Sequence, residues 1–161
     1  MSKFLRVLGF AWAMPVTVFG LVYACVFSAL KWYKFIGVRG DTLVWQLNAE
    51  KAPVWLEKAW ASWGGHTVGT VIVVKNNPDD NRGKTTLLHE QEHARQCMIL
   101  GPLWPLAYGL IMLAMKVSCR NADAYFSHPF EVDARRAAGE TIDVEGALKK
   151  VQEKTRALNK N

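Results

Sequence analysis

Residues 89–93 read His89-Glu90-Gln91-Glu92-His93, which is the pattern H-E-x-x-H. Residues four positions apart lie one above the other on the same face of an α-helix, so the two imidazoles can bind one metal ion. The glutamate that follows the first histidine is then placed to hold and deprotonate a water on that ion. The stretch predicts a helix with His89 and His93 as metal ligands and Glu90 as the general base.

The segments before this motif predict a short sheet. Thr67–Lys75 is rich in β-branched residues and is the best strand in the chain, and Asp41–Asn48 favours a second, short strand. Residues 76–83 are polar and contain proline and glycine, which indicates a loop. Thr85 or Thr86 can then cap the motif helix.

A further helix is expected between Pro53, which suits a first helical turn, and Gly64, which suits a stop. Its tryptophans and small apolar residues recur at helical spacing, which favours a core-facing or membrane-facing stripe over a substrate-binding role. His66 follows directly, at the head of the predicted strand, and is expected to be a surface or capping residue.

The N-terminal region contains 24 consecutive uncharged residues, Val7–Leu30. About 20 apolar residues suffice for a helix to cross the hydrocarbon core of a bilayer. Lys3 and Arg6 precede this run and Lys31-Trp32-Tyr33-Lys34 follows it, as at a membrane interface. A retained transmembrane anchor is therefore predicted, in preference to a cleaved signal peptide, whose hydrophobic region is shorter, and to a buried core helix. The basic residues on its two sides favour a cytoplasmic catalytic part only slightly.

A second uncharged run, Cys97–Met115, follows the motif. Pro102 and Pro105 interrupt it, so the motif helix is expected to end near Leu100. From Trp104 onward the run would be about 18 Å long as a helix, which is short for a full crossing. A re-entrant, interfacial or core-packed segment is favoured over a second span.

Two histidines leave a catalytic zinc site without its third protein ligand. Gln96 and Ile99 stand where the metzincin pattern requires glycine and histidine, which excludes that class. The candidates lie further on: Pro129 suits a helix start, and Glu131 would then lie in the first turn, facing the two histidines. The alternatives are Asp133, Asp123 and His128.

Composition adds weaker indications. The net charge of +6 fits an anionic membrane surface at least as well as nucleic acid, and no nucleic-acid-binding pattern is present. Three cysteines without C-x-x-C spacing make a disulfide framework unexpected. Residues 144–161 have the pattern of a basic amphipathic helix, with either a packing face or a membrane-contacting face.

Taken together, these stretches resemble a family. The octapeptide HEQEHARQ (89–96), the segment LGPL (100–103) and the later segment PFEVDAR (129–135) are similar to the gluzincin-type zincins, in particular to small bacterial and phage zincin-like proteins with a distal F-E-x-x-A element. The resemblance covers roughly residues 67–139. It implies that His89, His93 and Glu131 are zinc ligands and that Glu90 is the general base.

The sequence thus predicts an α+β fold with two parts. Residues 1–34 form an N-terminal transmembrane anchor, and residues 35–161 form a zincin-like metal-binding domain with a basic C-terminal helix. The expected function is that of a membrane-anchored, Zn2+-dependent hydrolase of a peptide or protein substrate, with Tyr125 or His128 as a candidate donor to the oxyanion. The alternatives are a small membrane protein with a structural or vestigial zinc site, and a membrane-interaction protein without metal.

Overall fold

The computed structural model describes residues 3–118 and 124–140, which form an α+β fold. The helical elements are α1 (Lys3–Ala29), α2 (Val54–Ala59), α3 (Asn81–Leu100), the single 3-10 turn η1 (Gly101–Leu103), α4 (Trp104–Ser118) and α5 (Pro129–Ala137). The strands are β1 (Tyr33–Arg39), β2 (Thr42–Leu47), β3 (Gly65–Val68) and β4 (Val71–Val74). The predicted α+β class is confirmed. Asp123 and the predicted C-terminal helix lie outside the described residues.

The four strands form one mixed sheet in the order β1-β2-β4-β3, with β3 at an edge. β2 and β4 are parallel, and the other two pairs are antiparallel. The predicted strand at 41–48 is confirmed as β2. The prediction of one strand over Thr67–Lys75 is wrong, because the chain reverses at Gly69 and forms the β3–β4 hairpin instead. Gly69 has a φ of +67°, a conformation that glycine adopts without steric cost.

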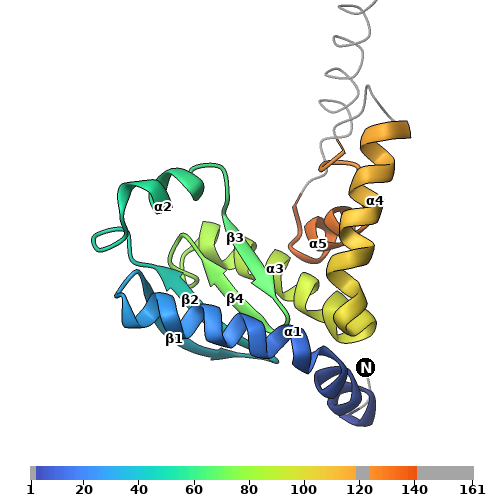
Figure 1. Cartoon of the computed structure of the whole chain (residues 1–161), viewed down its shortest axis with the longest axis horizontal. Helices are drawn as coiled ribbons and strands as arrows, with labels where there is room; N and C mark the ends of the chain where they lie inside the picture. The colour runs from blue at the N-terminus through green and yellow to red at the C-terminus, as the bar shows by residue number, and fades with distance from the viewer. Residues whose placement is uncertain (1–2, 119–123, 141–161) are drawn as a thin grey trace, which may run out of the picture.

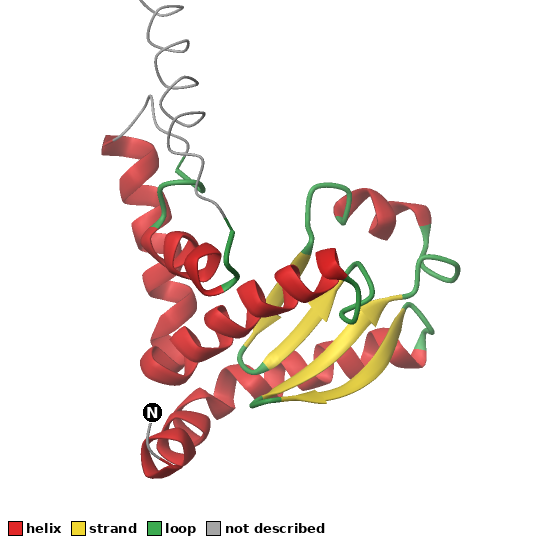
Figure 2. Cartoon of the chain, turned by 180° about the vertical axis from the view of Figure 1, so that it is seen from behind, coloured by secondary structure: helices red, strands yellow, loops and turns green. Residues whose placement is uncertain are grey.

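The sheet lies between two helices, and each of its faces has its own core. Figure 1 shows α1 in front of the sheet, and Figure 2 shows α3 on the opposite face. On the α1 side, Val71 and Val73 are buried against Ala24, Tyr33 and Trp60. On the α3 side, the cluster consists of Val44, Ile72, Val74 and Leu87. β4 is buried on both faces, which explains its uninterrupted run of Val and Ile.

The predicted N-terminal apolar helix is confirmed as α1, and its two faces differ. The buried face consists of small residues three or four positions apart: Gly9, Ala13, Thr17, Gly20 and Ala24. The Thr17 hydroxyl accepts a hydrogen bond from the Thr70 backbone N–H at 3.1 Å, which fixes α1 on the hairpin. The outer face exposes large apolar side chains, including Phe4, Val7, Phe19, Val22 and Val26. The boundary at residue 34 stays a prediction, although α1 packs closely on the rest of the chain.

The motif helix α3 starts earlier than the sequence predicts. Its N-cap is Asp80, whose carboxylate accepts a hydrogen bond from the Gly83 N–H at 2.6 Å. The expectation that Thr85 or Thr86 caps the helix is wrong. Their hydroxyls instead donate to backbone carbonyls one turn earlier, inside the helix. The predicted end near Leu100 is confirmed.

The helix predicted between Pro53 and Gly64 is shorter than expected, and the second uncharged run forms two elements. α2 ends at Ala59, well before Gly64, and Pro53 is its N-cap residue. The run after Leu100 forms the η1 turn and then α4, which extends away from the sheet (Figure 1).

By length and composition, two helical stretches could cross a membrane: α1, and the continuous run Asn81–Val117 that joins α3, η1 and α4.

Candidate metal centre

The fold brings His89, His93 and Glu131 together. The two histidines come from successive turns of α3, and the glutamate comes from the first turn of α5, which packs against α3. All three are buried, with exposed fractions of 9, 6 and 3 %. Each offers one ligand atom within 4.8 Å of the others, so the group could hold a metal ion. This is the ligand set that the sequence predicts.

The distances within this group match the spacing around a small tetrahedral ion. His89 Nε2 and His93 Nε2 are 3.2 Å apart. The Glu131 carboxylate oxygens lie 3.3 Å from each of them, Oε2 next to His89 and Oε1 next to His93. A tetrahedral ion with bonds of about 2.0–2.1 Å separates its ligand atoms by about 3.3 Å. Each histidine nitrogen thus lies at about this spacing from the other histidine nitrogen and from one Glu131 oxygen, and the three ligand atoms lie within 4.8 Å of one another, as a small ion requires.

The charge of Glu131 also suits a cation. Burial alone would raise the pKa of its carboxyl group, but hydrogen bonds from His89 and His93 outweigh burial and hold the pKa well below its usual range. The Tyr108 hydroxyl, from α4, donates to Oε1 at 2.8 Å. Oε2 is buried and makes no hydrogen bond of standard geometry: His89 Nε2 lies 3.3 Å away and Arg135 Nη2 lies 3.7 Å away. A cation bound between the histidines would compensate the charge of this buried carboxylate more closely than these longer contacts do.

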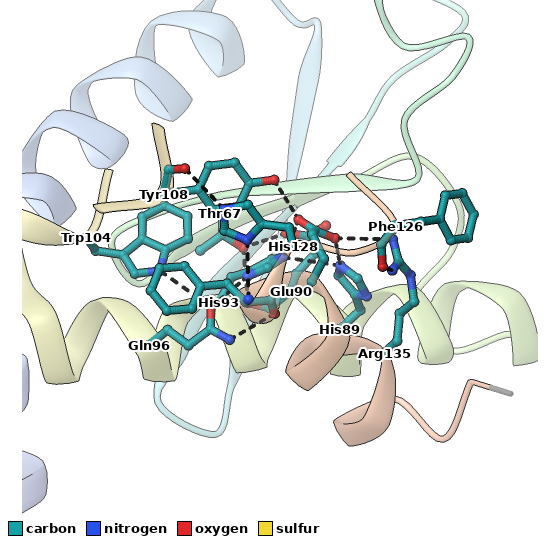
Figure 3. Close-up of polar contacts among 12 residues, drawn as sticks. Thr67, His89, Glu90, His93, Gln96, Trp104, Tyr108, Phe126, His128 and Arg135 are labelled. Carbon is teal, nitrogen blue, oxygen red and sulfur yellow. Dashed lines mark hydrogen bonds and ion pairs between the residues drawn. The ribbon is translucent and has the colours of Figure 1, made fainter. Parts of the chain in front are cut away.

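Gln96 orients His93 and was not singled out from the sequence as a site residue. Its side-chain carbonyl lies 2.9 Å from His93 Nδ1, which leaves Nε2 directed at the ligand group (Figure 3). Its amide donates to the Phe130 backbone carbonyl at 3.0 Å, next to Glu131. Gln96 thus links a candidate histidine ligand to the start of α5, as partners of metal-binding histidines commonly do. The sequence signal that could have identified Gln96 is its position three residues after His93, on the same face of the helix.

The predicted general base, Glu90, lies beside the ligand group and contacts the edge strand β3 (Figure 3). The Thr67 hydroxyl lies 2.7 Å from Glu90 Oε2 and 3.0 Å from its backbone carbonyl. A Cβ at Gly65 would be 2.8 Å from Glu90 Cγ, so only glycine leaves room for this side chain. Burial raises the pKa of Glu90, against the lowering effect of the nearby His93 and the Thr67 hydrogen bond. A raised carboxyl pKa suits a group that accepts a proton near neutral pH.

The alternative third ligands that can be located do not join the group. His128 is the N-cap of α5: its Nδ1 accepts from the Phe130 N–H at 3.3 Å, and its Nε2 lies 3.1 Å from the Tyr108 carbonyl. Asp133 is exposed and faces Arg136 at 3.9 Å. Both nitrogens of His128 are thus engaged within the protein, which leaves neither for a metal or an oxyanion.

The expectation that His66 is a surface or capping residue is wrong. Its ring is half-buried among aromatic side chains, with centroids 5.6 Å from Tyr23, 4.8 Å from Trp60 and 6.2 Å from Trp63. Burial lowers its pKa to about 4, so His66 is neutral at pH 7. Successive residues of β3 point to opposite faces of the sheet, so His66 packs on the α1 side while Gly65 and Thr67 face Glu90.

No protein-family model matches this chain, and neither a curated protein nor a solved structure is significantly similar to it.

Proposed function

We propose that this protein is a membrane-anchored, zinc-dependent hydrolase of the zincin type that cleaves peptide bonds. One observation carries the proposal: three buried side chains with the spacing of a tetrahedral zinc site stand directly beside the buried carboxyl group of Glu90. The gluzincin resemblance of residues 67–139 supports the same assignment. His89, His93 and Glu131 would hold the zinc, as two imidazoles and a carboxylate do in catalytic sites that keep one position open.

Zinc in such a site lowers the pKa of a coordinated water to about 7 and polarises a carbonyl group. Glu90 would accept the proton of the attacking water and return it to the leaving nitrogen. Thr67 and Gly65 fix the position of its carboxyl group on the β3 side. Tyr125, from the segment before α5, would be the donor to the oxyanion on giving up its hydrogen bond to Glu131, which helps to raise the pKa of its hydroxyl.

The position of β3 supports a peptide as substrate. β3 is an edge strand, and two of its residues contact Glu90. An extended peptide that adds to a sheet edge is aligned by main-chain hydrogen bonds. A peptide paired with β3 would therefore run alongside the ligand group, with its carbonyls close to Glu90.

Zinc content and hydrolysis, measured on the same purified protein, test this proposal. We expect about one zinc per chain and cleavage of fluorescence-quenched peptides that stops with 1,10-phenanthroline and returns on adding zinc. Zinc without cleavage would instead favour a structural or vestigial site. Protein that cannot hold zinc would contradict the whole assignment.

The membrane part of the proposal rests on α1. Its outer face exposes large apolar side chains, and basic residues stand before it and after it: Lys3, Arg6, Lys31 and Lys34. We expect the full chain to remain in the membrane pellet after an alkaline carbonate wash, with residues 1–30 intact by mass spectrometry. Release into the supernatant, or a chain that begins after residue 25, would contradict a retained anchor.

A further inference from the structure

α4 carries two faces of different character, and the inner face belongs to the metal centre. Trp104 and Tyr108, one turn apart, project from it. The Tyr108 hydroxyl donates to Glu131 Oε1 at 2.8 Å, and the Tyr108 ring stacks on His128 with centroids 4.2 Å apart. The Trp104 ring lies 5.8 Å from that of His93. The position of α4 therefore affects the position of a proposed zinc ligand.

The outer face of α4, together with the last residue of η1, is a continuous apolar stripe. Its side chains recur every three or four residues and are 56–65 % exposed: Leu103, Leu106, Leu110, Leu113 and Val117. No charged residue occurs between Arg95 and Lys116. A soluble surface seldom exposes a contiguous apolar patch of this kind unless another apolar phase or molecule covers it.

The surroundings of this stripe point to lipid. A Cβ at Gly101, where the chain bends from α3 toward α4, would lie 2.4 Å from the Trp12 ring of α1. Trp12, a half-exposed residue of the proposed anchor α1, is thus in contact with the η1 turn that leads into α4. Lys116 is exposed at the far end of the stripe, where it would meet anionic headgroups. As a helix of 15 residues, α4 is about 22 Å long, which suits penetration of part of a bilayer about 30 Å thick.

We propose that the outer face of α4 inserts into the hydrocarbon of a lipid bilayer, and that this contact holds Tyr108 against Glu131. The bilayer then acts as a structural partner of the metal centre, and Tyr108 is the positioning residue that connects them. The second half of this inference rests on the proposed zinc site, whereas the lipid contact does not.

Lipid photolabelling tests the contact directly. The full chain is reconstituted in vesicles of phosphatidylcholine and phosphatidylglycerol that contain a phospholipid with a photoactivatable acyl chain, and labelled residues are mapped by mass spectrometry. We expect label on Leu106, Leu110 and Leu113, and none on residues 81–88 of α3. Unlabelled α4 would overturn the lipid assignment.

Zinc release to a chelator in the same vesicles tests the connection to the metal centre. Leu110→Glu should speed release about tenfold, the scale of losing a partner of a metal ligand. Val38→Glu, at an exposed apolar position of β1, should match the wild type. Tyr108→Phe should also speed release, and adding Leu110→Glu to it should have little further effect.

The outcomes are separable. A wild-type release rate in both Leu110→Glu and Leu106→Glu would overturn the coupling, whatever the photolabelling shows. A wild-type chain that binds no zinc would overturn the proposed function and with it the coupling. The labelling pattern would still decide whether α4 contacts lipid.

Discussion

Replacing Glu131 with alanine should weaken zinc binding by more than about 100-fold, because the change removes a proposed ligand and the only anionic group that touches both histidines among the described residues. Asp133→Ala, on the same helix, should leave zinc binding unchanged, since Asp133 is exposed and faces Arg136. The measurement is a zinc competition titration with a chelator of known affinity at pH 7.

Glu131 is buried beside Arg135 and Tyr108, so its loss could disturb the fold as well as the site. Glu131→Gln keeps the volume and one acceptor oxygen, and circular dichroism of both variants separates misfolding from ligand loss. A folded Glu131→Gln protein with wild-type zinc affinity would contradict the ligand assignment. A larger loss of zinc affinity in Asp133→Ala than in Glu131→Ala would also contradict the assignment.

The candidate ligand set could be predicted because its constraints are local or chemical. The four-residue spacing of His89 and His93 requires a helix, and Pro129 places Glu131 in a first helical turn. The contact between α3 and α5 is tertiary and leaves no local pattern. The approach of Glu131 to the two histidines was inferred only because a catalytic zinc ion needs a third protein ligand.

The supporting residues were harder to predict. Tyr108 lies in an apolar run whose composition indicates membrane contact, and nothing in that run shows that its hydroxyl reaches Glu131. Gln96 could have been found from helical spacing, whereas the Phe130 carbonyl that it binds could not. The wrong prediction that Thr85 caps α3 has a similar cause, because Asp80 and Thr85 are both good N-cap residues. The close approach of Gly83 to residues 77–78, a tertiary contact, favours Asp80 as the cap.

The β3–β4 hairpin shows where a local pattern misleads. β-branched residues from Thr67 to Val74 favour extended backbone throughout, and a single glycine within them does not by itself predict a reversal. α1 supports the reversal, because the Thr17 hydroxyl accepts a hydrogen bond from the Thr70 N–H next to the turn. A helix predicted only as an anchor therefore also determines the edge strand beside the proposed catalytic group.

The exchange Glu90→Gln should leave zinc content and folding almost unchanged and lower peptide hydrolysis by about 10²- to 10⁴-fold. Glutamine keeps the size of the side chain and still fits against Gly65. Its amide oxygen can accept the hydrogen bond that the Thr67 hydroxyl now donates to Glu90 Oε2. It cannot accept a proton from water. The loss should therefore appear in kcat rather than in zinc affinity.

Glu92→Gln provides the matched control for this variant. Glu92 lies two residues further along α3, and its carboxylate pairs with Arg95 at 2.7 and 2.9 Å rather than with any proposed ligand. Hydrolysis by Glu92→Gln should stay within about twofold of the wild type, because the change removes only an ion pair with the exposed Arg95. Zinc content, circular dichroism and cleavage are measured on both variants side by side. Wild-type cleavage by a zinc-loaded Glu90→Gln protein would show that Glu90 is not the base, since the residue would then be dispensable in a site that is otherwise complete.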